Sequence, residues 1–104
     1  MGGVDIVDLA ERRGTPFYVY DADVIRRKHA MLSGALSGID LYYSIKANPS
    51  LAVMEILAQG GYGAQGGCGA EVASPGEIAI AIRAGIPAGR WACWDPDTEQ
   101  VLWC

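Results

Sequence analysis

Lys46 is the residue best placed for chemistry in this sequence, because it ends a strand-like run, LYYSIK, at positions 41–46. Side chains alternate along a strand, so Tyr42, Ser44 and Lys46 are expected to share one face. Apolar surroundings favour the uncharged form of an amine, and an uncharged amine is a nucleophile. A lysine at a strand end is more commonly just solvated, so the pattern alone leaves a nucleophilic and a structural interpretation open.

The residues after the lysine predict a helix that begins at once. Asn48 is a good N-terminal cap, and Pro49 suits the first helical position because its missing NH group is not needed there. Free backbone NH groups and the positive end of the helix dipole favour an anionic ligand. The sequence therefore predicts an amine beside a site for an anionic group, at the junction of a strand and a helix.

The rest of the chain predicts helices and strands in alternation. The expected elements are a helix over 4–13 that stops at Gly14, a strand over 17–20, a helix over 22–36, the strand that ends at Lys46, a helix that ends at Gly60, a strand over 70–73, a helix that ends at Gly85 and a strand over 91–94. Such alternation predicts an α/β fold with a parallel sheet. In a β/α barrel the chemistry lies at the carboxyl ends of the strands, where Lys46 and Ser74 fall.

Ser74 and Glu77 stand in a capping-box pattern, Ser-Pro-Gly-Glu, in which polar side chains pair with free NH groups at a helix start. This pattern gives Glu77 a sufficient structural role. Capping alone and capping combined with a role at the site remain equal alternatives for Glu77.

The helix over 22–36 has a predicted buried stripe, made of Ile25, His29, Leu32 and Leu36. His29 is the only histidine of the chain, and histidine is a common catalytic base. Because no polar group adjacent in the sequence would orient it, we expect His29 to be packed rather than catalytic.

Length and composition restrict the class of protein. With 104 residues and a formal net charge of −4, the chain makes one small acidic domain, and we expect it to bind no nucleic acid. No apolar run reaches the ~20 residues that span a bilayer, so a cytoplasmic protein without a membrane partner is expected. The three cysteines lack the spacing of a disulfide framework or a metal site, which predicts reduced thiols and no bound metal.

Three segments in the same order resemble the alanine-racemase-like (fold type III) decarboxylases that use pyridoxal 5′-phosphate, the group of diaminopimelate, ornithine and arginine decarboxylases. The attachment motif of that group, an aromatic, a small and an apolar residue followed by Lys-Ala-Asn, matches YSIKAN at 43–48. TPFYVYD at 15–21 is similar to its entry strand, and EVASPGE at 71–77 is similar to its second barrel strand and the turn after it. The resemblance covers 15–90, whereas 91–104 reads as a degenerate or divergent tail.

The resemblance implies a fold and a domain organisation. The expected fold is the N-terminal part of a (β/α)8 TIM-type barrel, with the first two to three βα units and an entry strand. A complete barrel takes about 250 residues, so residues 1–104 are expected to form a truncated domain that binds pyridoxal phosphate. The phosphate loop, the partner of the ring nitrogen and the second domain of full-length members have no match, so we expect the isolated chain to be inactive.

The resemblance also implies an activity and a site. Lys46 is expected to be the catalytic residue that binds the cofactor, and the residues expected to contact the cofactor with it are Ser44, Asn48, Glu71, Ser74 and Glu77. Glu71 replaces the aspartate usual in the group and retains a carboxylate. The implied reaction is decarboxylation of an amino acid of the diaminopimelate or ornithine type, a small-molecule substrate, by a full-length enzyme that is homodimeric.

An amino-acid racemase and a non-enzymatic pyridoxal-phosphate-binding protein share the barrel and remain alternatives, and both would use Lys46. A nucleotide-binding module is a third, because GYGAQG at 61–66 matches the dinucleotide fingerprint. We reject that interpretation, since the run follows a helix and precedes a strand, opposite to the order that phosphate binding needs. AQGGYG at 58–63 is nearly repeated as AQGGCG at 64–69, so we interpret the run as a duplicated loop.

Overall fold

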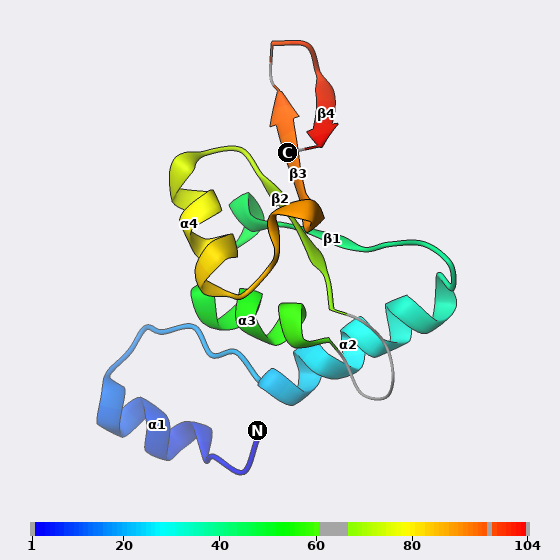
Figure 1. Ribbon diagram of the computed structural model, residues 1–104. Coiled ribbons are helices and arrows are strands. Elements are labelled where there is room, and N and C mark those ends of the chain that lie inside the picture. The colour runs from blue at the N-terminus through cyan, green and yellow to red at the C-terminus, as the bar shows by residue number, and fades with distance from the viewer. Residues whose placement is uncertain (1, 61–66, 96, 104) are drawn as a thin grey trace.

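A computed structural model describes residues 2–60, 67–95 and 97–103. It contains four α-helices, four strands and two short 3-10 turns within these residues (Figure 1). In chain order they are α1 (Ile6–Arg13), α2 (Ala22–Ala35), β1 (Tyr42–Ser44), η1 (Ile45–Ala47), α3 (Leu51–Gln59), β2 (Gly69–Val72), α4 (Pro75–Arg83), η2 (Ala88–Arg90), β3 (Trp91–Asp95) and β4 (Gln100–Trp103). The α/β class predicted from the sequence is confirmed.

The four strands form one sheet in the order β1-β2-β3-β4. β1 pairs with β2 and β2 with β3 in parallel, whereas β4 pairs with β3 in the antiparallel direction. The sequence did not predict β4. Because the first three strands are parallel, their carboxyl ends meet at one edge of the sheet. This arrangement is consistent with an N-terminal piece of a pyridoxal-binding barrel domain, and the closed barrel itself stays a prediction.

The core lies between β2 and the two helices that flank it in the sequence. Met54 of α3, Ala70 and Val72 of β2, and Ala81 of α4 are at most 1% exposed and belong to one cluster. Since Ala70 and Val72 share a face of the strand, α3 and α4 cover the same side of the sheet (Figure 1). Glu71 points to the opposite side, which carries the candidate site.

The position of Gly69, at the start of β2, has no room for a side chain, because Tyr42 and Arg90 approach its Cα atom closely. A Cβ atom there would lie 2.5 Å from the Tyr42 ring and 2.8 Å from the Arg90 carbonyl oxygen. Tyr42 and Gly69 are partners in the register of β1 and β2. The tyrosine ring therefore lies across the glycine, on the side of the sheet that also carries Glu71.

The predicted helix signals are confirmed at both ends of several helices. Asp21 caps α2 by accepting a hydrogen bond from the Asp23 NH group at 2.9 Å. Asp5 was expected inside the helix over 4–13 but is the cap of α1, where it accepts from the Val7 NH group at 2.9 Å. The glycines at 14, 60 and 85 have positive φ values of 78°, 91° and 85° directly after or near the helix ends, as stop signals do. None of the helices in the described ranges is long and apolar enough to cross a membrane.

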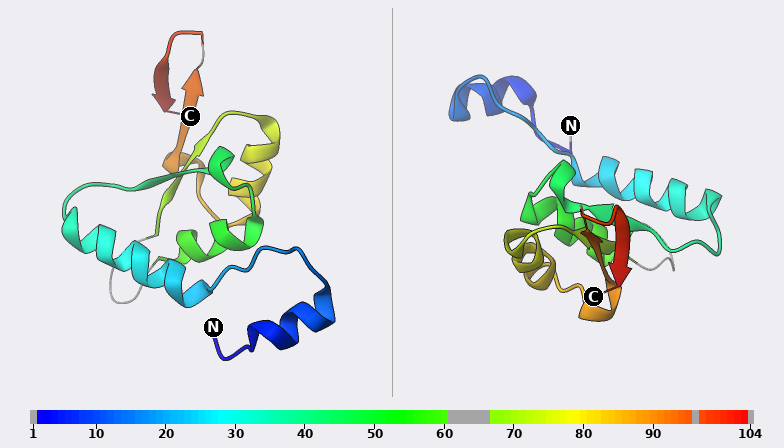
Figure 2. Two further views of the ribbon diagram at one scale, coloured as in Figure 1. Left: turned by 180° about the vertical axis from the view of Figure 1, so that it is seen from behind. Right: turned by 90° about the horizontal axis from the view of Figure 1, so that it is seen from above.

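Residues 2–20 form an N-terminal arm whose helix lies apart from the sheet, while Tyr20 at its end is a neighbour of Tyr43 on β1 (Figures 1 and 2). Its helix, α1, has no buried residue. The predicted entry strand over 17–20 is wrong, because these residues are in no helix or strand and pair with no described strand. Tyr18 is 92% exposed and Tyr20 58%. A strand needs a neighbouring strand to bond with, and the described residues offer none at this position.

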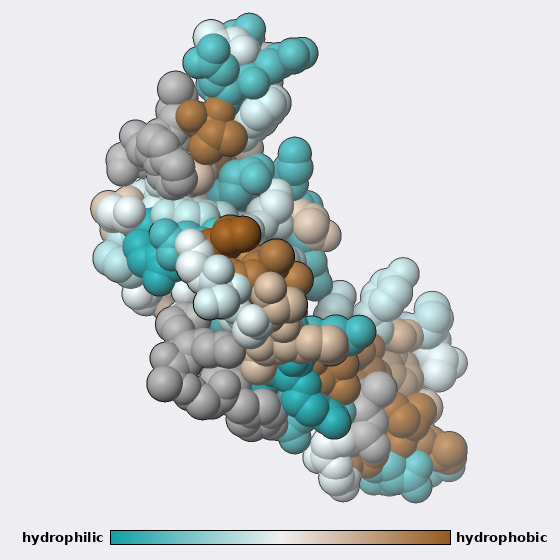
Figure 3. Space-filling model, turned by 90° about the vertical axis from the view of Figure 1, so that its right-hand side faces the viewer, coloured by the Kyte–Doolittle hydropathy of each residue, from teal (hydrophilic) through white to brown (hydrophobic). Residues whose placement is uncertain are grey.

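The predicted stripe on α2 is only partly correct. His29 is buried at 6% exposure, as expected for a packed histidine, but Leu32 is 51% exposed and Leu36 38%. The reason is that α3 is the main described element that packs against α2, and it covers one side of the helix. The space-filling view shows apolar patches that remain at the surface between hydrophilic ones (Figure 3).

Among the described residues, Cys93 departs from the expectation of reduced thiols. Cys68 is a free and buried thiol, whereas Cys93 on β3 is disulfide-bonded. Spacing along the sequence gave no signal for this bond, because a disulfide depends on distances in the folded chain. The fingerprint-like run at 61–66, and with it most of the duplicated loop, lies outside the described residues.

Candidate active site

Lys46 lies on the 3-10 turn η1, directly after β1, and not on the strand itself. The expectation that the strand ends at Lys46, with its side chain on the face of Ser44, is therefore wrong. Ile45, before the lysine, is 0% exposed and lies in the core, as alternation along a strand would also place it. The Asn48 NH group donates to the Ile45 carbonyl oxygen at 3.1 Å and closes the turn. Lys46 still follows the carboxyl end of a parallel strand, as predicted.

The side chain of Lys46 is exposed rather than surrounded by apolar groups. No described acidic residue forms an ion pair with its amine, since the two ion pairs found involve Arg12 and Arg26. An amine without a paired carboxylate is accessible to a ligand. The apolar surroundings expected for the Lys46 amine are not found.

The helix after Lys46 begins later than predicted. Ser50 is the N-terminal cap of α3, its Oγ accepting from the Val53 NH group at 3.5 Å, and Leu51 is the first helical residue. Asn48 instead stabilises the segment between Lys46 and α3, because its Oδ1 accepts from the Ser50 NH group at 3.2 Å. Asn48 and Pro49 were read as cap and first residue since both types favour those positions, but serine competes equally as a cap.

Ser44 and Glu71 meet at the ends of β1 and β2. They are partners in the strand register, both are half-buried, and the Ser44 hydroxyl donates to Glu71 Oε1 at 3.3 Å. Both residues were predicted to lie near a cofactor. The structure brings them into contact with each other at the edge of the sheet that Lys46 follows, on the side opposite α3 and α4.

The capping box at the start of α4 is confirmed. Ser74 is the N-terminal cap and its Oγ accepts from the Glu77 NH group at 3.2 Å. The Glu77 carboxylate accepts from the Ser74 hydroxyl at 2.9 Å and from the Ala73 NH group at 3.3 Å. The structural interpretation of Glu77 is thus satisfied, and an additional role at the site stays a prediction. A hollow of about 240 Å³ lies between this turn and the end of β3, lined in part by Ser74, Ile78 and Trp94.

Tyr43 is a residue of this region that the sequence argument did not single out. Its hydroxyl donates to the Asn48 carbonyl oxygen at 3.2 Å, across the turn that carries Lys46. Burial raises the pKa of the Tyr43 hydroxyl, and the neighbouring Tyr20 raises it further. The available signal was the aromatic position of the motif, which had been treated only as an apolar strand residue.

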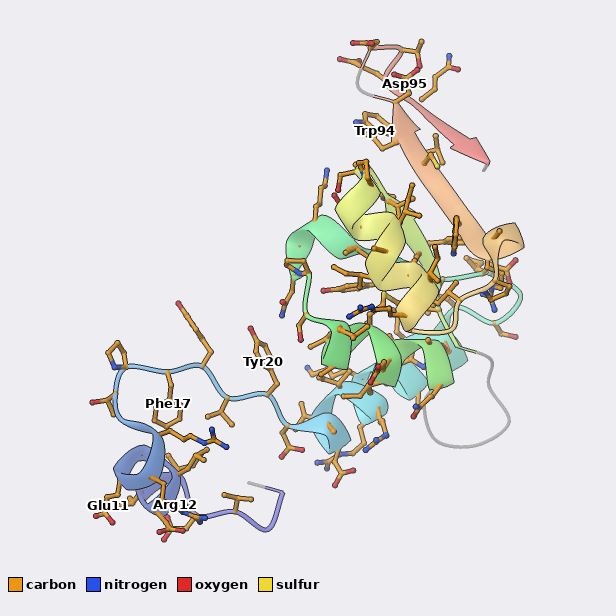
Figure 4. The ribbon with its side chains drawn as sticks, turned by 60° about the vertical axis from the view of Figure 1, so that its left-hand side comes forward. Glu11, Arg12, Phe17, Tyr20, Trp94 and Asp95 are labelled. Atoms are coloured by element: carbon orange, nitrogen blue, oxygen red, sulfur yellow. The ribbon has the colours of Figure 1, made fainter. Side chains whose placement is uncertain are left out.

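Asp95 ends β3 at the same edge and forms a turn that leads into β4 (Figure 4). Its carboxylate accepts from the Thr98 hydroxyl at 2.8 Å and from the Asp97 NH group at 2.9 Å. These hydrogen bonds, that of Thr98 first, lower the pKa of the Asp95 carboxyl. The three parallel strands therefore end in a lysine turn, a capping box and an aspartate turn.

Comparison with known proteins identifies the class to which this arrangement belongs. Residues 22–99 match the family described as pyridoxal-dependent decarboxylase, pyridoxal binding domain. The chain belongs to this family.

Its similarity to diaminopimelate decarboxylase from Methanothermobacter thermautotrophicus is 42% identity over 94 residues, or 86% of this chain and 21% of that protein. Diaminopimelate decarboxylase from Bacillus subtilis is 38% identical over 95 residues, with 86% and 20% covered. L-glutamyl-[BtrI acyl-carrier protein] decarboxylase from Niallia circulans is 38% identical over 85 residues, with 81% and 18% covered. The chain spans about a fifth of the length of the curated relatives that it matches.

Proposed function

We propose that this chain is the part of a pyridoxal-phosphate-dependent amino-acid decarboxylase that carries the cofactor-binding lysine, Lys46. The observation that carries the proposal is the place of Lys46 in its motif, directly after the carboxyl end of β1, within the segment that matches the family. The sequence motif and the names of the relatives support this reaction class, and the topology of the sheet fits a piece of the pyridoxal-binding domain.

The residues at this edge fit the attachment of an aldehyde cofactor. A primary amine is the group that condenses with an aldehyde, and the Lys46 amine is exposed and makes no ion pair with a described residue. Pyridoxal phosphate, when bound, supplies an electron sink that accepts the electrons left when a bond to the α-carbon of an amino acid breaks. The chain's contribution is to hold the amine at this position.

The neighbouring polar residues define the remaining roles. Ser44 and Glu71 are hydrogen-bonded to each other at the ends of β1 and β2 and form one polar wall of the proposed site. Ser74 and Glu77 fix the turn at the start of α4, and Asn48 fixes the turn after Lys46. In the proposed site these groups orient the lysine and bound the space beside it, without themselves accepting a proton from the substrate.

The substrate class is an amino acid that loses its carboxylate. The relatives named above include enzymes for diaminopimelate and for a glutamyl group on a carrier protein, so the family serves more than one substrate. Diaminopimelate is the first compound to test, because it is the one named most often among the similar proteins. Decarboxylation is favoured over racemisation since the family description also names it.

The test compares three versions of the 104-residue chain: the native sequence, Lys46→Arg and Lys28→Arg. Lys28 and Lys46 are the two lysines of the chain, so Lys28→Arg is a matched control. Pyridoxal phosphate is added and its visible absorption spectrum is followed. We expect the spectral shift of lysine condensation in the native chain and in Lys28→Arg, and its loss in Lys46→Arg.

Release of carbon dioxide from radiolabelled diaminopimelate is measured on the same samples. We expect none from the isolated chain, because the groups that hold the phosphate and the ring nitrogen are not among the residues assigned to this site. A spectral shift that survives Lys46→Arg would contradict the proposal.

A further inference from the structure

The turn that carries Lys46 is fixed on both sides by contacts of its neighbours. Ile45, directly before the lysine, is fully buried in the core. Asn48, on the other side, donates its NH group to the Ile45 carbonyl oxygen at 3.1 Å. Lys46 and Ala47 between these anchors are exposed. The position of the lysine backbone therefore depends on Ile45 and Asn48 rather than on packing of its own side chain.

Tyr43 connects the second anchor to the sheet. Its hydroxyl donates to the Asn48 carbonyl oxygen at 3.2 Å, so the hydrogen bond spans the whole turn. The tyrosine is half-buried on β1 and packs against the core cluster. Because the ring is held on β1, its hydroxyl keeps Asn48 at a fixed distance from the strand.

We propose that Tyr43 is a positioning residue for Lys46, whose hydroxyl holds the Asn48 carbonyl group and so fixes the turn from which the lysine amine projects. The inference rests on the proposed function, in which Lys46 is the attachment lysine. Tyr43 does not touch the cofactor in this account. It acts through Asn48 and the turn between them.

The first test measures the turn without any cofactor, by amide hydrogen exchange of the full chain in NMR. Tyr43→Phe keeps the ring and removes only the hydroxyl, and Tyr18→Phe is the matched control because Tyr18 is 92% exposed. We expect the Asn48 amide to exchange roughly three- to tenfold faster in Tyr43→Phe, the range for one lost hydrogen bond. The Gly69 amide, bonded to the Leu41 carbonyl oxygen at 2.9 Å, is expected to keep its native rate.

The second test measures the lysine itself. Pyridoxal phosphate is fixed to lysines with borohydride, and peptide mapping gives the ratio of label on Lys46 to label on Lys28. We expect Tyr43→Phe to lower this ratio roughly three- to tenfold, and Tyr18→Phe to leave it at the native value. If Tyr43 only stabilised the fold as a whole, Tyr43→Phe would affect labelling of both lysines alike and leave the ratio unchanged. Circular dichroism checks that the variant is folded.

The outcomes separate this inference from the proposed function. A native exchange rate at Asn48 in a folded Tyr43→Phe overturns the inference, and so does faster exchange with an unchanged labelling ratio. If the native chain shows no preference for Lys46 over Lys28, the proposed function fails. In that case the exchange rate at Asn48 alone decides whether Tyr43 holds the turn.

Discussion

The body of the molecule, from β1 to β3, and the N-terminal arm, residues 2–20, differ in what holds their elements in place. In the body, α3 and α4 bury side chains against β2, and Met54 and Ala81 are fully buried there. In the arm, α1 forms with its cap and stop but buries no residue. Phe17 faces α1 while Tyr20 extends away from it (Figure 4).

The difference shows which local signals suffice for structure. A helix makes its hydrogen bonds within its own segment, so Asp5 and Gly14 are enough to delimit α1. A strand makes its hydrogen bonds with another strand, so the β-forming residues 17–20 stay unpaired while 69–72 pair on both sides. The body supplies partners for its strands, and the described part of the arm does not.

The largest expected effect comes from removing a core side chain of the body. Met54→Ala is expected to lower the free energy of unfolding by about 2–5 kcal/mol, because Met54 is fully buried between α3 and β2. Phe17→Ala in the arm is expected to change it by about 0.5 kcal/mol or less. Urea unfolding followed by circular dichroism measures both. Equal losses for the two variants would show that arm and body unfold as one unit.

A smaller effect is expected at Gly69. Gly69→Ala places a Cβ atom 2.5 Å from the Tyr42 ring, so the ring or the strand must move, at a cost of about 1–3 kcal/mol. Gly89→Ala is the control, since no atom lies within 4 Å of a Cβ atom there. Thermal unfolding compares the two. A Gly69→Ala protein as stable as Gly89→Ala would mean that Tyr42 does not lie across the glycine.

The caps of α1 and α4 give a matched pair for the comparison of arm and body. Ser74→Ala removes the cap of α4 and is expected to destabilise the body by about 1 kcal/mol. Asp5→Ala removes the cap of α1 and is expected to lower helix content without moving the main unfolding transition, because α1 buries no residue. Helix content and the urea midpoint are read from the same titration. A shift of the midpoint by Asp5→Ala would place α1 in the cooperative unit.

The smallest effect is a dependence on pH at the β3–β4 turn. Hydrogen bonds from Thr98 and Asp97 lower the pKa of Asp95 below its ordinary value of 3.8. The stabilisation of the turn is therefore complete above that value and is lost as the pH falls through the lower pKa of the folded state. The protection factors of the amides of residues 100–103, which correct for the intrinsic exchange rate at each pH, should fall over this acid range, and Asp95→Asn should remove the dependence. A fall that persists in Asp95→Asn would assign it to another group.

The sequence predicted the elements that depend on local signals or on alternation. The expected helices over 4–13 and 22–36 are found as α1 and α2, the expected strand over 70–73 is found one residue earlier as β2, and the capping box of Ser74 and Glu77 begins α4. The errors concern the ends of elements and the residues whose pairing depends on distant parts of the fold. Alternation along 41–46 leaves Ile45 on the apolar face, where it is buried, but it gave no sign that the strand ends at Ser44 and that the hydrogen bond from Asn48 to Ile45 closes a turn at Lys46.

The candidate site was predicted in the same uneven way. The place of Lys46 after a parallel strand and the nearness of Ser44 to Glu71 follow from strand order and register. The hydrogen bond from Tyr43 to Asn48 could not be predicted in this way. It crosses a turn that we had expected to be the end of a strand followed by a helix cap. Sequence patterns located the lysine, and the structure is needed to see what orients it.

Labelling of lysines by pyridoxal phosphate under borohydride reduction shows whether Lys46 is the attachment residue. The native chain is labelled once when folded and once in urea, and the ratio of label on Lys46 to label on Lys28 is determined by mass spectrometry. We expect label to concentrate on Lys46 in the folded chain and the ratio to fall toward one in urea. Equal labelling of the two lysines in the folded chain, or preference for Lys28, would contradict this expectation.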